Sequence, residues 1–243
     1  MSRIGHRLSQ IIPDNPAAAL FQREWQTYRK MVDQNYLFHR EVYARLHRIL
    51  LDEAPSPFRF LDIACGDAGS TADALRGTPI ASYYGIDLSR TALDIAGKSL
   101  ATLRCPVDLR EDDFATALHE WHEPIDVAWI GLSLHHFQTP AKLNLMREVH
   151  RILRPGGLFL IYENASPDGE DRESWLRRWD EQKPLWTAYT PEEWNAMMAH
   201  VHASDLPETN ARWHDLGQQA GFSEARELFV APSDLFRMYY FGA

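Results

Sequence analysis

Cysteine is scarce in this sequence: Cys65 and Cys105 are the two cysteines among 243 residues, and no C-x-x-C pair occurs. A disulfide framework and a cysteine-based zinc site are therefore not expected. The sequence also lacks an 18-residue apolar run and an N-terminal apolar segment of the secretory type. From these absences we expect reduced cysteines, a cytoplasmic location and no membrane partner.

Basic residues are fewer than acidic ones, 25 against 34, so the formal net charge is −9. Nucleic-acid-binding proteins usually present a basic face, whereas the arginines at Arg172, Arg177 and Arg178 are interleaved with acidic neighbours. We therefore expect no nucleic-acid partner. The expected partner is a small molecule, bound by a monomer or a homodimer.

Short apolar segments alternate with helical patterns through the middle of the chain. The expected strands are Phe60–Ile63, Tyr83–Asp87, Cys105–Leu109, one that begins at Ile125 and one that ends at Glu163. This alternation predicts a doubly wound parallel sheet, in which ligands bind at the carboxyl ends of the strands. Two later strands are expected at Ala225–Val230 and Asp234–Tyr240, after a helix that stops at Gly221.

The first strand runs into a turn of small residues, Ala64–Gly69, and the second ends in an acid, Asp87. This is the layout of a βαβ nucleotide site, where small residues let the backbone approach a ligand and the acid binds ribose hydroxyls. Asp62 and Asp67 repel a pyrophosphate and suit a ligand with a cationic amino group, such as S-adenosylmethionine. A strand–turn–helix without any ligand is the alternative.

At these residues the chain resembles the class I S-adenosylmethionine-dependent methyltransferases, whose loop follows a D/E-x-G-x-G-x-G pattern. Two glycines of that pattern are alanine here, Ala64 and Ala68. The segment LRPGG, at Leu153–Gly157 before an apolar strand, is a second mark of the family. The resemblance covers Phe58–Glu163 firmly. It implies an α/β, doubly wound Rossmann-like sheet of about seven strands with an antiparallel C-terminal hairpin.

The resemblance also implies S-adenosylmethionine as the cofactor and assigns residues to it. These are Asp62, Ala64 and Gly66 at the methionine end, Asp87 at the ribose, Leu88, Asp113 and Phe114 at the adenine, and Gly131 and Leu132 along its length. For Asp113 the alternative is an acidic first turn of the following helix, which the helix dipole favours. Both roles are compatible for that residue.

Methyl transfer from a sulfonium is an in-line displacement that needs a positioned acceptor and the exclusion of water, and only sometimes a general base. The best base candidate is His136, with His135 beside it, because both follow the fourth strand at its carboxyl edge. Glu163, at the end of the fifth strand, is the second candidate. The alternatives are helix capping or packing for the histidines and a surface or capping role for Glu163.

Two further segments are expected to enclose the substrate. Residues 1–57 are predicted to form a helical lid on a domain of residues 58–243, and residues 164–210 of that domain are predicted to be a helical cap insertion. The candidate pocket residues are Tyr28, Tyr36, His39 and Trp175. Aromatic packing of the lid and the cap is the alternative for these side chains.

Several other chemistries can be set aside. Base-modifying enzymes of this fold carry N/D-P-P-Y/F after the fourth strand, where this chain has Gly131–Leu134. The metal-dependent catechol type needs a set of acids near that strand, and Asp126 lies at the wrong end of it. Two cysteines are too few for arsenic methylation. His200 and His202 resemble a metal pair without an evident third ligand, so no metal site is expected.

We therefore expect methyl transfer to a small organic acceptor with an oxygen, nitrogen or carbon nucleophile. One rival is a non-enzymatic module that binds the cofactor or its product. A second is a nicotinamide oxidoreductase, which predicts glycine in place of Ala68 and no acid at Asp67. A narrower variant is an enzyme that modifies the cofactor itself.

Overall fold

The structure, a computed structural model, describes residues 27–243. The chain divides into two compact units, Met1–Leu37 and Phe38–Ala243. In the first unit, residues 27–33 are helical and residues 34–37 form a turn. The part of the predicted lid before residue 27 lies outside the described residues.

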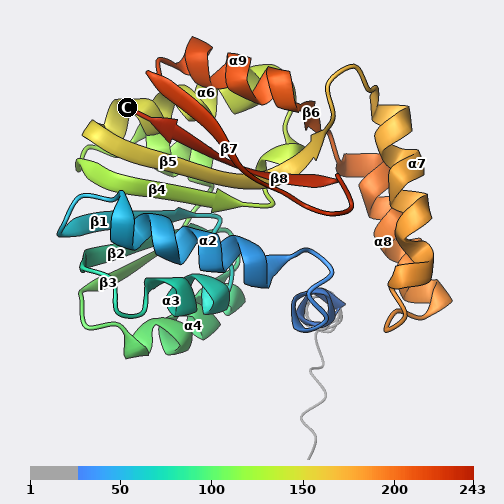
Figure 1. The fold of residues 1–243 in the computed structure, drawn as a ribbon. Coiled ribbons are helices and arrows are strands. Elements are labelled where there is room, and N and C mark those ends of the chain that lie inside the picture. Colours follow the sequence, from blue (N-terminus) through green and yellow to red (C-terminus); the bar gives the residue numbers. More distant parts are fainter. Residues whose placement is uncertain (1–26) are drawn as a thin grey trace, which may run out of the picture. The chain divides into compact units, whose positions relative to one another are not determined.

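The second unit is built on a sheet whose main path has the strand order β3-β2-β1-β4-β5-β8-β7 (Figure 1). Its strands are β1 (Phe58–Ile63), β2 (Ile80–Asp87), β3 (Val107–Glu111), β4 (Ile125–Gly131), β5 (Leu153–Ser166), β7 (Glu224–Val230) and β8 (Phe236–Gly242), and a short β6 (Glu208–Thr209) pairs with the end of β5. Neighbours from β3 to β5 are parallel, and β8 is antiparallel to β5 and β7. The predicted sheet with its antiparallel C-terminal hairpin is confirmed.

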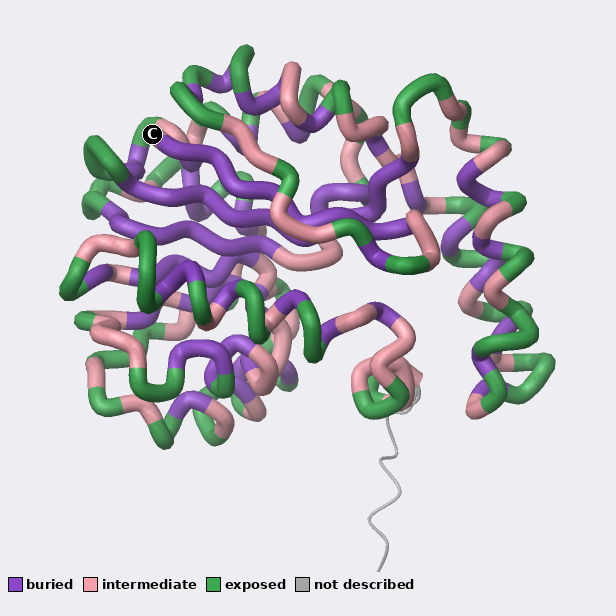
Figure 2. Tube along the Cα trace, viewed as in Figure 1, coloured by how far each residue is buried: buried purple, intermediate pink, exposed green. Residues whose placement is uncertain are grey.

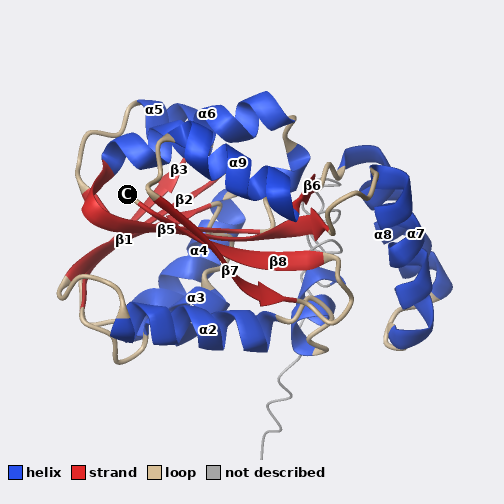
Figure 3. Ribbon diagram, turned by 45° about the horizontal axis from the view of Figure 1, so that its top comes forward, coloured by secondary structure: helices blue, strands red, loops and turns tan. Residues whose placement is uncertain are grey.

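Helices cover both faces of this sheet, with α2, α3 and α4 on one face and α5, α6 and α9 on the other (Figure 3). The helices are α2 (His39–Asp52), α3 (Gly69–Leu75), α4 (Arg90–Ser99), α5 (Phe114–His119), α6 (Thr139–Ile152), α7 (Arg172–Gln182), α8 (Pro191–Ser204) and α9 (Asn210–Ala220). Side-chain caps set several starts: the Ser89 hydroxyl accepts the N–H of Ala92, and the Thr209 hydroxyl accepts that of Arg212. Helix α9 ends as predicted, with Gly221 in the left-handed region.

The core lies along the central strands, which Figure 2 shows as continuous buried segments. The first six residues of β4, Ile125–Ile130, are all buried. Each large apolar side chain buried there contributes about 1.5–3 kcal/mol. The one acid among them, Asp126, accepts the N–H of Arg59 (2.8 Å) and pairs with the Arg154 guanidinium (3.3 Å). Its position at the start of β4 keeps this charge away from the carboxyl edge.

Helix α2 belongs to the same compact unit as the sheet. His47 Nδ1 lies 2.7 Å from the carbonyl oxygen of Ala74 in α3. Tyr43 packs edge-on against Trp129 of β4, with ring centroids 5.5 Å apart. The unit therefore begins at Phe38, earlier than the predicted boundary at residue 57, because α2 packs as a layer of the domain. The lid role stays a prediction.

Helices α7 and α8 fall within residues 164–210 and lie together beyond the ends of β5 and β8 (Figure 1). Helix α7 contacts the sheet through an aromatic pair: Trp179 packs edge-on against Phe236 of β8, at 5.5 Å between centroids. Trp179 also packs edge-on against Trp175 of its own helix, at 6.1 Å. Trp175 is fully buried, and its Nε1–H donates to the carbonyl of Leu235 (3.4 Å). Trp175 thus packs inside the fold, and its substrate-pocket role stays a prediction. Within residues 27–243, no helix combines the length and the apolar character needed to cross a bilayer.

Candidate functional site

The turn after β1 holds three residues in the left-handed backbone region. Ala64, Gly66 and Ala68 have φ of 56°, 54° and 50°, values that side chains larger than glycine rarely adopt. They occupy the three glycine positions of the family pattern, so both alanines keep its backbone course. A Cβ built on Gly66 would meet no atom of the described residues within 4 Å. The turn therefore leaves open space beside its backbone for a ligand.

The acid at the end of β2 is hydrogen-bonded to this turn. Asp87 Oδ2 accepts the N–H of Gly66 and Asp87 Oδ1 accepts the N–H of Ser89, both at 2.8 Å. A carboxylate oxygen has a second lone pair, so each can accept one more donor. The structure thus joins the predicted turn and the predicted acid, and the ribose role of Asp87 stays a prediction.

Asp62 lies inside the end of β1, 2% exposed, and its Oδ2 accepts the Tyr83 hydroxyl from β2 at 2.8 Å. Burial raises the pKa of Asp62 to about 7, although hydrogen bonds from Tyr83 and Thr71 favour the ionised form. The group is therefore poised between its two forms near neutral pH. Sequence reasoning missed Tyr83, because strand register decides which side chain of β2 faces Asp62.

The residues predicted at the adenine differ in what they expose. Asp113 is the N-cap of α5, where its Oδ1 accepts the N–H of Thr116 (3.0 Å). The side chain of Phe114 is buried in the core beside Phe137, at 5.4 Å between ring centroids. Leu88 is 67% exposed next to Asp87. Of these side chains, Leu88 offers an apolar surface to a ligand.

Backbone strain recurs at the end of β4. Leu132 has φ of 52°, and its N–H donates to the carbonyl of Tyr162 in β5 (2.7 Å). A Cβ on the preceding Gly131 would lie 3.4 Å from the Trp129 ring. The chain therefore leaves the sheet sharply at the two residues predicted to run beside the cofactor.

Glu163 holds the loop that follows β4. It is fully buried and accepts the N–H groups of Ser133 and Leu134, both at 2.7 Å, while its Oε2 lies 2.8 Å from His135 Nδ1. Burial acts to raise the pKa of Glu163, but His135 and these N–H groups outweigh it and hold the pKa below its usual value. Glu163 is therefore a charged anchor of the loop.

The two histidines of this loop differ in exposure. Burial lowers the pKa of His135, but the carboxylates of Glu163 and Asp205 outweigh it, so the net shift is upward. The His136 side chain is 40% exposed. Its burial and the neighbouring His135 and His200 lower the pKa of His136 to about 4. At neutral pH His136 therefore presents an uncharged imidazole with a free lone pair.

Asp205, the residue after α8, completes this polar cluster from the cap. Its Oδ1 lies 3.6 Å from His136 Nδ1, and its Oδ2 accepts the side-chain N–H of Asn164 (2.9 Å). Sequence reasoning missed Asp205 and Asn164, because neither belongs to a motif. The sequence analysis had singled out one neighbour of this cluster, His200, which lies five residues before Asp205.

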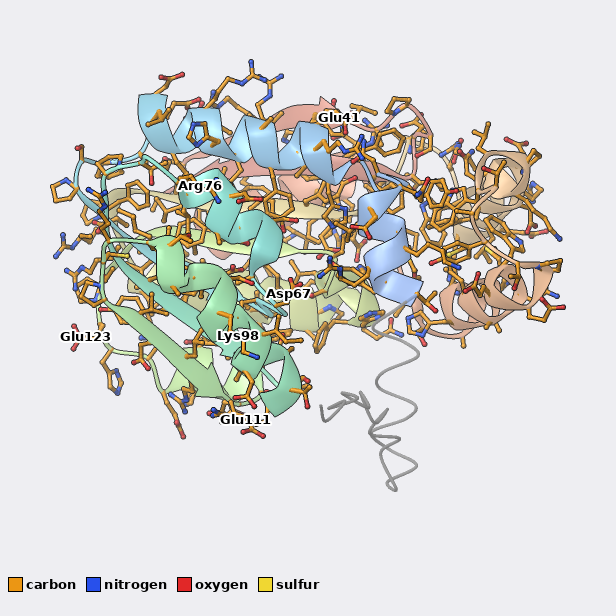
Figure 4. The ribbon with its side chains drawn as sticks, turned by 90° about the horizontal axis from the view of Figure 1, so that it is seen from below. Glu41, Asp67, Arg76, Lys98, Glu111 and Glu123 are labelled. Atoms are coloured by element: carbon orange, nitrogen blue, oxygen red, sulfur yellow. The ribbon has the colours of Figure 1, made fainter. Side chains whose placement is uncertain are left out.

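These groups gather at the carboxyl edge of the parallel strands, where ligands of doubly wound sheets bind. In Figure 4, Asp67, in the turn after β1, lies toward the end of the sheet nearer the cap, and Glu123, before β4, lies at the opposite end. Asp67 Oδ1 accepts the N–H of Gly69, which starts α3. Asp67 thus fixes the turn through this hydrogen bond and also adds a negative charge to it.

The predicted pocket residues near the N-terminus fall in both units. Tyr28 lies in the helix of residues 27–33, and Tyr36 lies in the turn after it. His39, the first residue of α2, is buried and stacks on Tyr43 with centroids 5.7 Å apart. Burial lowers the pKa of His39 to about 4. Their substrate-pocket roles stay predictions.

Residues 60–157 match the protein family described as "Methyltransferase domain". A demethylmenaquinone methyltransferase from Lactococcus lactis subsp. lactis is 30% identical over 109 residues, which are 44% of this chain and 42% of that protein. A protein of the same name from Staphylococcus epidermidis is 26% identical over 149 residues, 61% of this chain and 60% of that protein. The chain thus spans about half the length of the relatives it matches.

Among solved structures, an O-methyltransferase family protein from Burkholderia thailandensis superposes with a TM-score of 0.61 at 17% identity, over 87% of this chain and 57% of that one. An identity this low shows the shared fold. The fold agrees with the course of the turn at Ala64–Ala68 and with the matched domain. Residues 60–157 thus carry a methyltransferase domain, and the predicted resemblance to the class I S-adenosylmethionine-dependent methyltransferases is confirmed.

Proposed function

We propose that this chain transfers the methyl group of S-adenosylmethionine to a small organic acceptor with an oxygen, nitrogen or carbon nucleophile. The observation that carries the proposal is the hydrogen bond from Gly66 N–H to Asp87 Oδ2. It joins an acid suited to a ribose diol to a turn with open space beside its backbone. Both lie within the residues that match the methyltransferase domain.

The residues around this turn fit the cofactor by charge and shape. S-adenosylmethionine supplies a methyl group already activated by the positive sulfur. Asp62 is proposed to hold the cationic amino group, Asp87 the ribose hydroxyls and the exposed Leu88 the adenine face. Asp67 beside the turn disfavours the pyrophosphate of a nicotinamide cofactor.

On the acceptor side, His136 is the proposed contact among the three predicted catalytic residues. His135 and Glu163 are hydrogen-bonded to each other and hold the loop, so we propose a positioning role for both. His136 keeps exposed surface and an uncharged imidazole, which can take a proton from an acceptor hydroxyl or amine. An acceptor without such a proton would need positioning alone.

The names of the relatives suggest where to begin with acceptors. Two are demethylmenaquinone methyltransferases, and a structural neighbour is an O-methyltransferase family protein. Aromatic compounds that carry hydroxyl or quinol groups are therefore the first panel that we propose, followed by amines. A module that binds the cofactor without using it is the remaining candidate, and turnover separates it from the enzyme.

The test has two stages. Thermal unfolding with S-adenosylhomocysteine, S-adenosylmethionine and NAD should show stabilisation by the adenosyl ligands and none by NAD, with about 2.7 kcal/mol expected at 100 times the dissociation constant. Transfer of an isotope-labelled methyl group to the acceptor panel then measures activity. Stabilisation by NAD alone, or by none of the three, contradicts the proposal. Binding with no transfer to any acceptor favours the binding module.

A further inference from the structure

Four side chains able to bind a metal meet where the cap faces the loop after β4. His135 and His136 come from the short helix Leu134–His136, and His200 and Asp205 come from α8 and the residue that follows it. Asp205 Oδ1 lies 3.8 Å from His135 Nε2, 3.6 Å from His136 Nδ1 and 3.8 Å from His200 Nε2. Three imidazole nitrogens thus surround one carboxylate oxygen.

These separations are too long for hydrogen bonds, which place N and O about 2.7–3.2 Å apart. They are close to the separations between ligands of a single metal ion. In a tetrahedral zinc site with bonds of about 2.0–2.2 Å, neighbouring donor atoms lie roughly 3.3–3.5 Å apart. Ligand atoms of His135, His136 and Asp205 all lie within 4.8 Å of one another. Small side-chain movements would bring these three groups into coordination, and His200 is placed to join from the exposed side.

The carboxylate oxygen at the centre of the cluster lacks a hydrogen bond. Asp205 Oδ1 is buried and has no hydrogen-bond partner among the described residues, whereas Oδ2 accepts the side-chain N–H of Asn164 at 2.9 Å. Buried polar atoms without a partner are rare in folded proteins, and an ion is one standard explanation for them. A cation placed among the three nitrogens would satisfy this oxygen.

The groups behind these ligands already orient them. Glu163 Oε2 lies 2.8 Å from His135 Nδ1, so His135 turns its other nitrogen toward the cluster. Metal-binding histidines commonly donate their second N–H to a carboxylate in this way. Two hydrogen bonds also fix the backbone around Asp205. The carbonyl oxygen of Asp205 accepts the Nε–H of Arg172 at 2.7 Å. The backbone N–H of Leu206 donates to the carbonyl oxygen of His135, also at 2.7 Å.

We propose that His135, His136, His200 and Asp205 bind a divalent transition-metal ion, with Zn²⁺ as the first candidate. Imidazole donors suit Zn²⁺ and its neighbours in the first transition series, whereas Mg²⁺ and Ca²⁺ take oxygen ligands. His135 and Asp205 form the buried floor of the site, and the side chains of His136 and His200 are 40% and 60% exposed, which gives an ion a way in. The ion would link α8 of the cap to the loop after β4.

The proposal goes beyond the proposed function, since metal binding needs neither S-adenosylmethionine nor an acceptor. A bound ion takes the lone pair of His136, so His136 serves as the proton acceptor only in the metal-free protein. The full chain is treated with a chelator, dialysed and titrated with ZnCl₂ by calorimetry, and the bound metal is counted by elemental analysis. We expect one ion per chain. His136→Ala and His200→Ala should weaken binding about tenfold or more. His202→Ala is the matched control, because His202 is an exposed histidine on the same helix, and it should bind as the wild type does.

Co²⁺ gives a second readout, because its visible absorption reports the coordination geometry. We expect a tetrahedral spectrum with the wild type and its loss in Asp205→Asn, with circular dichroism confirming that each variant is folded. Failure to take up stoichiometric Zn²⁺ or Co²⁺ overturns the proposal. Equal loss of binding in His202→Ala and His136→Ala also overturns it. Neither result bears on methyl transfer, because no cofactor is present in these assays.

Discussion

The backbone N–H of Gly66 donates to Oδ2 of Asp87 across 2.8 Å, so the turn after β1 and the end of β2 are held together. Asp87→Ala removes this bond and the proposed ribose acceptor at once. Hydrogen bonds to charged groups contribute about 1.5–3 kcal/mol. We therefore expect the affinity for S-adenosylhomocysteine, measured by calorimetry, to fall by about 10- to 150-fold.

The control for this variant is Asp94→Ala. Asp94 is an exposed acid of α4 that pairs with Arg90 on the surface (2.8 Å), and its loss should leave the affinity unchanged. An Asp87→Ala protein that is folded and binds S-adenosylhomocysteine as tightly as the wild type would rule out the ribose assignment.

Asp62 gives the proposed cofactor binding a pH dependence of predictable sign. Burial raises the pKa of Asp62 to about 7, so the free protein carries this group half protonated near pH 7. A bound ammonium group favours the carboxylate form, so binding releases a proton. The affinity for S-adenosylmethionine should then rise roughly tenfold from pH 6 to pH 8. Calorimetry at several pH values measures this slope.

Two variants test the origin of that slope. Asp62→Asn should flatten it, because no ionisable group remains at this position. Tyr83→Phe should move the midpoint to higher pH, because the Tyr83 hydroxyl stabilises the ionised carboxylate. A slope that survives in Asp62→Asn would assign the pH dependence to another group.

The same pKa shift affects the stability of the free protein. The folded-state pKa of Asp62, about 7, lies above the ordinary value of 3.8 for an aspartate, so the folded state binds more protons between these pH values. This contribution to stability is full below about pH 3.8 and is lost as the pH rises through 7. In urea unfolding, the free energy of unfolding of Asp62→Asn minus that of the wild type should therefore be larger at pH 8 than at pH 5.

Two helical glycines should respond in opposite directions to alanine. A Cβ on Gly217 of α9 would lie 2.5 Å from ring atoms of Phe241 in β8, whereas a Cβ on Gly97 of α4 would lie 3.8 Å from the Leu109 side chain. Gly217→Ala should lower the free energy of unfolding by about 1–3 kcal/mol through overpacking. Gly97→Ala should raise it by about 0.5–1 kcal/mol through helix propensity. Urea denaturation of both variants checks the pair, and a shift of the same sign in both would contradict the packing seen at α9.

Local patterns explain which parts of the fold were predictable from sequence. The segment Ile125–Ile130, apolar except for Asp126, has few alternatives to a central buried strand, and Gly221 marks the end of α9 by its left-handed conformation. The turn at Ala64–Ala68 was identified from its small residues. For each of these elements, the residues that decide the structure lie next to one another in the chain.

The remaining features depend on contacts between distant residues. An amphipathic pattern shows that α2 buries a face, but it does not show that the face packs on α3 and Trp129. Likewise, no motif connects His135 with Asp205, which meet only because the cap folds back to the loop after β4. The Tyr83–Asp62 hydrogen bond depends on strand register in the same way. The turn and the acids of the candidate site were therefore predicted from the sequence, whereas the cap residues Asp205 and Asn164 were not.

A buried ion pair fixes the last residues of the cap to α6, and its removal should lower the stability of the fold. Lys142 is fully buried, and its Nζ donates to Glu208 Oε1 (2.9 Å) and to the Leu206 carbonyl (2.5 Å). Lys142→Met leaves the Glu208 charge buried without its cation. We expect the free energy of unfolding, measured with urea, to fall by about 3–5 kcal/mol.

A double variant separates the lost ion pair from lost packing. In Lys142→Met with Glu208→Gln, the buried charge is gone, and the amide oxygen can still accept the Thr139 hydroxyl that now donates to Glu208 (2.7 Å). The double variant should therefore be more stable than Lys142→Met alone. Lys98→Met, at an exposed position of α4, should change stability by less than about 0.5 kcal/mol. If the double variant is no more stable than the single one, the loss comes from the shape of the Lys142 side chain, and the buried charge of Glu208 is not its cause.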